Sequence, residues 1–234
     1  MAPNSQIAQF TFPSAFPDLL FEQVEARIVA KMPSPSILQE NFLGGQNGVR
    51  YRLRACMDYS EEFVQSIRQR RTTPAQDDRY QQERQLFGFF VSGIAALDCF
   101  NFFVYMSAAI LSPNAFPIKT TGNTRNIKRK STAALFSVQF PGTEISDALM
   151  KLSDDPKLGE WEDLRNVLAH RAAPGRVVYA SIGTSKPDPD PDWKIDLTRS
   201  IKIDENLTPP RLNWLISTLA NLVSAADQFS KKFF

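Results

Sequence analysis

The sequence predicts a mainly α-helical fold, a helical bundle with one long central helix and a β-hairpin inserted near residues 177–203. Apolar residues recur at intervals of three and four along most of the chain, which is the spacing of amphipathic helices. An apolar run over 86–111 is long enough for the central helix, and residues 194–197 alternate as a strand does. The chain has no internal repeat and no interdomain linker, so residues 1–234 should form a single domain.

The composition is that of an ordinary globular protein, with 43% hydrophobic and 22% charged residues. The net charge of +2 is too small for global attraction to nucleic acid, so any RNA contact must come from local basic patches. Cys56 and Cys99 have no metal-ligand spacing and make no disulfide framework. We therefore expect a reducing, cytoplasmic location, with no metal and no cofactor.

The first seventy residues should form an arm and two helices. Residues 1–17 contain three prolines and scattered phenylalanines, and should form an extended arm lying on the body. Asp18 should then cap a first helix, whose apolar residues keep helical spacing up to Val29. The glycine-rich run over 44–48 should break the chain before a second helix over 51–71.

The apolar run over 86–111 is also long enough to cross a bilayer. It contains Asp98 and Asn101 near its middle, and a carboxylate at the bilayer centre costs about 2.5–3.5 kcal/mol on insertion scales. The chain offers no second apolar span to pair with it. We therefore expect no membrane contact, and assign the run to the buried central helix of a soluble bundle, which begins near residue 80 and stops before Pro113.

The second half should contain short helices, the hairpin and a long last helix. In chain order, we expect a basic irregular segment over 112–131, three helices over 132–140, 143–152 and 159–171, and two strands over 177–182 and 193–203. Alternating prolines and aspartates between the two strands should form a stiff acidic tip. Thr208 should cap the last helix, with Pro209 and Pro210 in its first turn.

The chain contains one histidine, His170, five residues after Arg165. Histidine is suited to proton transfer near neutral pH, and the planar guanidinium of arginine is suited to binding phosphate. On a helix, Asn166 and His170 share a face because they are four residues apart. Arg165 lies about 140° around the helix from His170 and must reach back with its long side chain.

The stretch from Leu164 to Arg171 (LRNVLAHR) resembles the R-x(4–6)-H motif of the HEPN superfamily, in the form with asparagine directly after the arginine. The resemblance extends over residues 80–229, where a long apolar helix precedes the motif helix and an amphipathic helix follows it. It implies a metal-independent endoribonuclease of the kind found among toxins and phage-defence effectors. It also implies that Arg165 and His170 are the catalytic pair, with Asn166 in a supporting role.

The single histidine also bears on oligomeric state. Cleavage of RNA by its own 2′-hydroxyl needs a base, an acid and cations, and acid–base catalysis by two imidazoles needs two copies of His170. A C2 homodimer would bring them into one cleft, and HEPN domains typically dimerise in this manner. We therefore expect a composite cleft lined by both copies of the motif.

Other polar residues are candidates for supporting roles. Asp98 should pair either with Arg165, orienting its guanidinium, or with another arginine, or else lie exposed at the rim of the bundle; Asn101 should share its helix face. The remaining basic candidates should either contact RNA phosphates or lie on a solvated surface: Arg171, Arg125, Lys128, Arg129 and Lys130.

Two alternatives to a nuclease remain open. One is a HEPN-like scaffold that binds RNA, nucleotide or a partner protein without catalysis. The other is a purely structural helical protein in which the match to the motif is accidental. If the protein is a nuclease, an antitoxin or a nucleotidyltransferase is a candidate regulatory partner.

Overall fold

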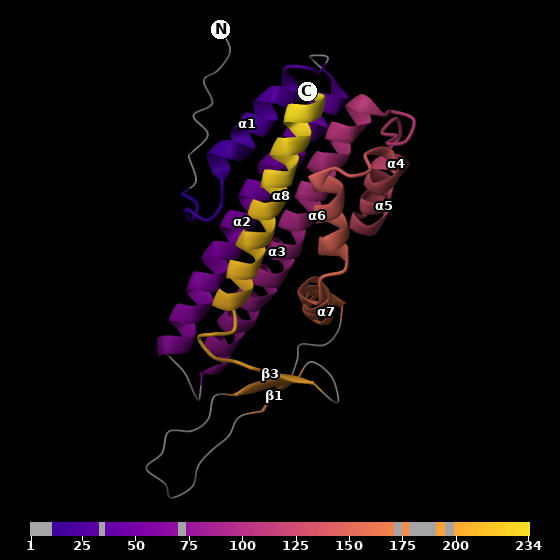
Figure 1. Cartoon of the computed structure of the whole chain (residues 1–234). Helices are drawn as coiled ribbons and strands as arrows, with labels where there is room; N and C mark the ends of the chain where they lie inside the picture. The colour runs from indigo at the N-terminus through magenta and orange to yellow at the C-terminus, as the bar shows by residue number, and fades with distance from the viewer. Residues whose placement is uncertain (1–10, 33–35, 70–73, 171–174, 178–190, 195–198) are drawn as a thin grey trace, which may run out of the picture.

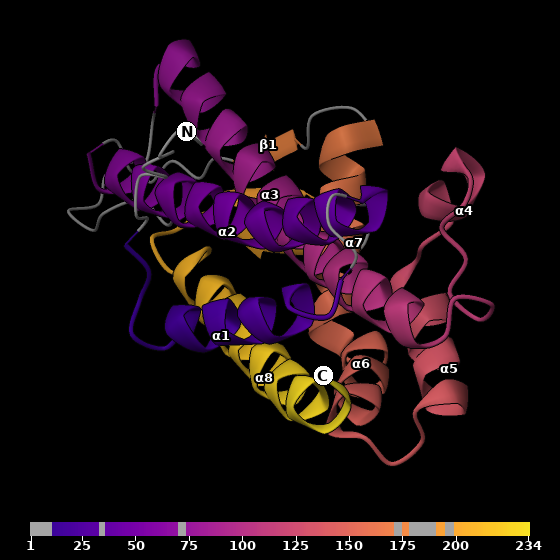
Figure 2. The ribbon, with the colours of Figure 1, turned by 90° about the horizontal axis from the view of Figure 1, so that it is seen from above.

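The computed structural model describes residues 11–32, 36–69, 74–170, 175–177, 191–194 and 199–234. These residues form eight helices and three short strands, so the mainly α prediction is confirmed. Two long helices, α2 (Ile37–Gln69) and α3 (Gln76–Leu111), pack side by side (Figure 1). The last helix, α8 (Pro209–Phe233), contacts both of them, and α1 (Asp18–Val29) packs on α8 (Figure 2).

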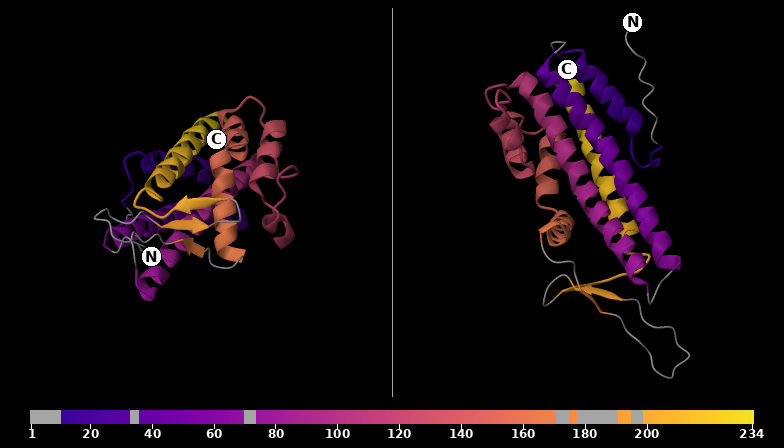
Figure 3. Two further views of the ribbon diagram at one scale, coloured as in Figure 1. Left: turned by 90° about the horizontal axis from the view of Figure 1, so that it is seen from below. Right: turned by 180° about the vertical axis from the view of Figure 1, so that it is seen from behind.

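Four shorter helices follow α3 in the chain, at the bounds Thr121–Arg125 for α4, Arg129–Gln139 for α5, Glu144–Ser153 for α6 and Pro156–His170 for α7. The predicted irregular segment over 112–131 therefore contains α4 and the start of α5. Helix α6 packs against α5 and α8, whereas α7 packs against α3. Helix α7 crosses the long axis of α3 near the end of the bundle where the small sheet lies (Figure 3).

The prediction that residues 44–48 break the chain is wrong, because α2 runs through them without interruption. The reason lies in α3. A Cβ atom on Gly45 would lie 3.0 Å from the backbone nitrogen of Phe103, and one on Gly48 would lie 2.6 Å from Sγ of Cys99. These two glycines let α2 approach the α3 backbone closely, and this packing outweighs their poor helix propensity.

Neighbouring glycines in α2 provide a matched pair of variants. Gly45→Ala should lower the free energy of unfolding by about 1–3 kcal/mol, because the new methyl group meets backbone that cannot move aside. Gly44→Ala should leave stability unchanged or raise it by up to about 1 kcal/mol, because nothing lies within 4 Å of its Cβ position. Urea unfolding of both variants checks this, and equal effects would contradict the close packing of α2 on α3.

The predicted central helix is α3, and its identification as a core helix is confirmed by burial. Its length and apolarity also meet the criteria for a membrane span, but 67% of its most apolar window is buried inside the bundle. Phenylalanine rings join α3 to its neighbours: Phe103 contacts Phe21 of α1 and Phe42 of α2, with ring centroids 5.1 Å and 4.7 Å apart. Aromatic packing therefore holds the centre of the bundle together.

The predicted single hairpin over 177–203 is observed as a three-stranded antiparallel sheet in the order β1-β2-β3. The strands span Gly175–Val177, Asp192–Lys194 and Ser200–Lys202, so the second predicted strand is divided into two that pair with each other. The fully buried Trp193 lies at the centre, opposite Arg176 on one side and Ile201 on the other. Most of the predicted acidic tip lies outside the described residues.

The two ends of the chain also differ in part from prediction. Residues 1–10 of the predicted arm lie outside the described residues, and Phe16 anchors the remainder by packing on Phe21. Thr208 occupies the N-cap position of α8, but its side chain makes no capping hydrogen bond. Instead it is buried and accepts a 2.8 Å hydrogen bond from the Ser60 hydroxyl, which ties the start of α8 to α2.

Candidate functional site

Helix α7 carries the motif, and one tryptophan fixes the helix to the bundle. Trp161 is 1% exposed, and its ring lies 4.9 Å and 5.2 Å from Phe89 and Phe90 of α3, measured between centroids. Gly93 of α3 makes room for the ring, because a Cβ atom there would overlap it. On the other side Trp161 contacts Trp214 of α8. The position of the motif therefore depends on contacts with both α3 and α8.

The motif residues lie at the edge of this buried stripe. Arg165 and Asn166 are half-buried and follow the buried Leu164. His170 is the last residue of α7, one turn after Asn166 on the backbone; its side chain, like the whole of Arg171, lies outside the described part of the structure. On the helix the backbones of Asn166 and His170 share a face, whereas Arg165 lies about 100° around the helix from Asn166.

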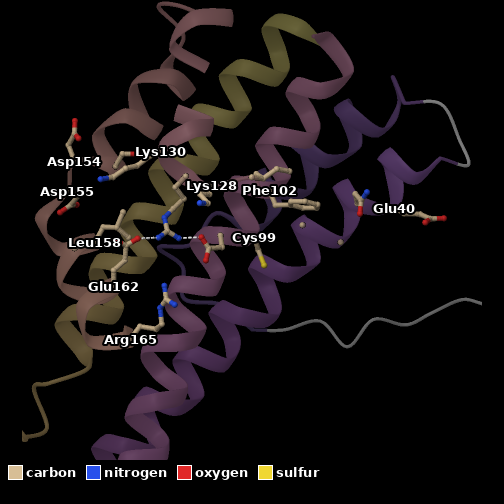
Figure 4. A pocket seen from close by; sticks show the side chains of 18 residues that line it. Glu40, Cys99, Phe102, Lys128, Lys130, Asp154, Asp155, Leu158, Glu162 and Arg165 are labelled. Carbon is tan, nitrogen blue, oxygen red and sulfur yellow. Dashed lines mark hydrogen bonds and ion pairs between the residues drawn. The ribbon is translucent and has the colours of Figure 1, made fainter. Parts of the chain in front are cut away.

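Arg165 lines a cavity of about 890 Å³ between α2, α3, the start of α5 and the α6–α7 connection (Figure 4). This volume is typical of small-molecule sites. Apolar walls come from Phe102, Ile127 and Leu158. The charged lining residues carry both signs: Lys128, Arg129, Lys130 and Arg165 are basic, and Glu40, Asp98, Asp154, Asp155 and Glu162 are acidic.

An arginine with two carboxylate partners lies on one wall of this cavity. One guanidinium nitrogen of Arg129 binds Asp98 of α3, and the other binds Glu162 of α7. The Arg129 side chain is only 11% exposed. Of the arrangements that the sequence left open for Asp98, the structure therefore combines two: the carboxylate pairs with an arginine other than Arg165, and its side chain is 57% exposed. Glu162 was not expected at the site, although it lies one helical turn before Arg165 and that spacing was a usable signal.

Arg165 itself has no such partner. It makes no hydrogen bond to any described residue, and its Nε is buried and unpaired. It is nevertheless close to Asp98: loss of solvent raises the pKa of the Asp98 carboxyl, while the positive charges of Arg129 and Arg165 lower that pKa. In Figure 4 the Arg165 side chain extends from α7 toward the two ion pairs of Arg129.

The remaining predicted residues take different positions. Asn101 is buried in α3 at 4% exposure, does not line the cavity, and its Oδ1 finds no hydrogen-bond partner among the described residues. Lys128 and Lys130 are exposed on the cavity rim, whereas Arg125 is exposed on α4 and is not part of the cavity lining. Within the described ranges no cluster of three His, Cys, Asp or Glu side chains has the arrangement of a metal site.

A more deeply buried ion pair lies between the sheet and α3. The Arg176 side chain is 2% exposed and donates from Nε to the Glu83 carboxylate at 3.0 Å and from a terminal nitrogen to the Gln82 side-chain oxygen at 2.5 Å. Burial raises the pKa of Glu83, and the charge and hydrogen bond of Arg176 lower it by less. This pair attaches β1, which follows the motif in the chain, to the first half of α3.

Glu83 predicts a pH effect on stability. Because its pKa is above the ordinary 4.5 in the folded chain, its contribution is fully present below that pH and is lost as the pH rises through the raised pKa. The free energy of unfolding of the wild type minus that of Glu83→Gln should therefore fall from about pH 4 to about pH 8. Urea titrations at each pH measure it, with Glu62→Gln on the exposed face of α2 as the charge-matched control. If this difference in the free energy of unfolding rises with pH instead, Arg176 lowers the pKa of Glu83 by more than burial raises it.

Comparisons with protein-family models, with curated protein sequences and with solved structures gave no match. The functional assignment below therefore depends on the motif and on the geometry around Arg165.

Proposed function

We propose that this protein is a HEPN-type, metal-independent endoribonuclease. The observation that carries the proposal is the Arg165 guanidinium, which has no hydrogen-bond partner among the described residues and lines a cavity next to the helix that also carries Asn166 and His170. A guanidinium without a carboxylate partner is free to bind phosphate oxygens through its planar set of donors.

The reaction follows from the chemistry of these side chains. The ribose 2′-oxygen attacks the adjacent phosphorus, the bond from phosphorus to the 5′-oxygen breaks, and the products end in a 2′,3′-cyclic phosphate and a 5′-hydroxyl. One His170 imidazole takes the 2′-hydroxyl proton, and a second protonates the leaving oxygen. Arg165 stabilises the negative charge that develops on the phosphate, and Asn166 orients the imidazole or a phosphate oxygen.

The test of this function is cleavage of labelled RNA by the purified chain in EDTA. We expect fragments with 2′,3′-cyclic phosphate ends, identified by their sensitivity to a phosphatase only after acid opening of the ring. Absence of cleavage at concentrations where the chain is dimeric would overturn the proposal. Expression of the wild type should also be toxic in the cytoplasm, as expected of a toxin or phage-defence effector, and toxicity should disappear in Arg165→Ala and His170→Ala.

The dimeric cleft makes a separate quantitative prediction. If each active site needs His170 from two chains, an equal mixture of wild-type and His170→Ala protomers that exchange freely should keep about a quarter of the wild-type activity, because only wild-type pairs are active. Independent sites would keep half. Cleavage rates measured across a series of mixing ratios distinguish a quadratic from a linear dependence, and a linear one would contradict the shared cleft.

The mixed charge of the cavity favours a second candidate function, a HEPN-like scaffold that binds a nucleotide without cleaving RNA. Five carboxylates among the lining residues are unfavourable for a long RNA strand but are compatible with a small ligand. In that case ATP or AMP should raise the melting temperature of the wild type, and no RNA cleavage should occur. An antitoxin or nucleotidyltransferase partner is compatible with either function.

A further inference from the structure

Arg165 lies beside two carboxylates and pairs with neither. Glu162 precedes it by one turn on α7, and Asp98 on α3 is close enough for the Arg165 charge to lower its pKa. Both carboxylates are instead bound by Arg129, the first residue of α5. The Arg129 guanidinium therefore joins three helices, α3, α5 and α7.

An arginine next to a free carboxylate forms a charge-assisted pair, often through two parallel hydrogen bonds. A guanidinium held in that way has fewer donors left for phosphate. Without Arg129, Asp98 and Glu162 would be two uncompensated negative charges beside Arg165. They would capture its guanidinium and repel an incoming phosphate.

We propose that Arg129 is a positioning residue, which keeps Arg165 available for phosphate by occupying both Asp98 and Glu162. The identity of the phosphate as part of an RNA substrate rests on the proposed function. Whether the Arg165 guanidinium pairs with a carboxylate does not rest on that function, and this pairing can be measured without RNA.

Arg129 has the properties that this role requires. Its planar fork binds one carboxylate at each terminal nitrogen, which the single ammonium of lysine does poorly. It is held in place at the start of α5, where Thr132, Ala133 and Phe136 are buried in the bundle. This role differs from the RNA contact expected of Arg129 from sequence, since both terminal nitrogens already have protein partners.

The test follows the Nε–Hε resonance of Arg165 by NMR in the full chain, assigned through its loss in Arg165→Lys. In the wild type this resonance should be that of a group without a carboxylate partner. In Arg129→Ala it should move downfield by about 1 ppm or more, as expected for a hydrogen bond to a carboxylate. In the triple variant Arg129→Ala/Asp98→Asn/Glu162→Gln it should return to the wild-type position, because both competing charges are gone.

A matched control is Arg211→Ala. Arg211 of α8 binds Glu160 of α7, so its loss also removes an ion pair from the motif helix, but one that involves neither Asp98 nor Glu162. The Arg165 resonance should not move in this variant. An equal shift in Arg211→Ala and Arg129→Ala would mean that the resonance reports general loosening of α7, and would overturn the proposal.

Cleavage provides the second measurement. Arg129→Ala should lower the rate by at least about tenfold, and the triple variant should recover to within about threefold of the wild type, although it lacks both ion pairs. If the role of Arg129 were purely structural, the triple variant would not recover its cleavage rate, and that result would overturn the proposal. If the wild type cleaves no RNA, the proposed nuclease fails, while the NMR shifts still decide whether Arg129 controls the pairing of Arg165.

Discussion

Arg165→Ala should lower the rate of RNA cleavage by about 10²–10³-fold, the usual cost of removing one donor that stabilises developing negative charge. His170→Ala should lower it by about 10²–10⁴-fold through loss of acid–base catalysis. The structure adds an expectation about stability. Because Arg165 makes no hydrogen bond to a described residue, its removal should change the free energy of unfolding by less than about 1 kcal/mol.

Cleavage rates in EDTA and urea unfolding of the same preparations check both parts. Arg54→Ala is the control, because Arg54 pairs with Asp58 on the partly exposed surface of α2 and lies outside the cavity lining; it should keep full activity. Arg165→Lys should recover only part of the rate, because an ammonium lacks the planar fork. Cleavage by Arg165→Ala at the wild-type rate would show that Arg165 is not catalytic, and a loss of stability well above about 1 kcal/mol would assign it a structural role.

Trp161→Ala should lower the free energy of unfolding by about 3–5 kcal/mol, the largest effect we expect on stability. The ring is fully enclosed by Phe89, Phe90 and Trp214, and the space in front of Gly93 would be left as a cavity. Because this ring fixes α7 to α3 and α8, the position of Arg165 depends on it. RNA cleavage should therefore fall in Trp161→Ala even under conditions where most of the protein remains folded.

Urea unfolding and near-ultraviolet circular dichroism measure this effect. Trp161→Phe keeps an aromatic ring and should cost less than half as much, because it leaves a smaller void. Gly159→Ala is the control on the same helix, since nothing lies within 4 Å of its Cβ position and alanine favours a helix. A loss below about 1 kcal/mol in Trp161→Ala would contradict the packing of α7 described above.

Local patterns in the sequence were sufficient for elements whose signals are repeated many times. The central helix is an example, because its long apolar run is confirmed in α3 and its boundary before Pro113 is one residue from the observed end at Leu111. The motif helix was predicted for a similar reason, since Trp161, Leu164 and Val167 form a buried stripe that places Arg165 and Asn166 at its edge. Only the first turn of α7, from Pro156, was missed.

Signals carried by one or two residues were less reliable. Thr208 looked like a helix cap by residue type, but its side-chain oxygen accepts a hydrogen bond from the Ser60 hydroxyl, 148 positions away in the chain. Residues 193–203 had the character of one strand, but the run divides between two strands, β2 and β3, that pair with each other. The hydrogen-bond partner of Thr208 and the pairing of these strands are set by the fold, which residue type and alternation do not reveal.

The sequence by itself determined the helical class, the central helix and the candidate residues Arg165, Asn166 and His170, because periodicity and motif spacing are properties of neighbouring residues. Only the tertiary structure decided that the glycines at 45 and 48 belong inside a helix, since the close approach of α3 is what favours them there. Only the tertiary structure also decided the partner of Asp98. Arg129 is 31 positions away in the chain, and charges pair according to their distance in space, which residue spacing does not reveal.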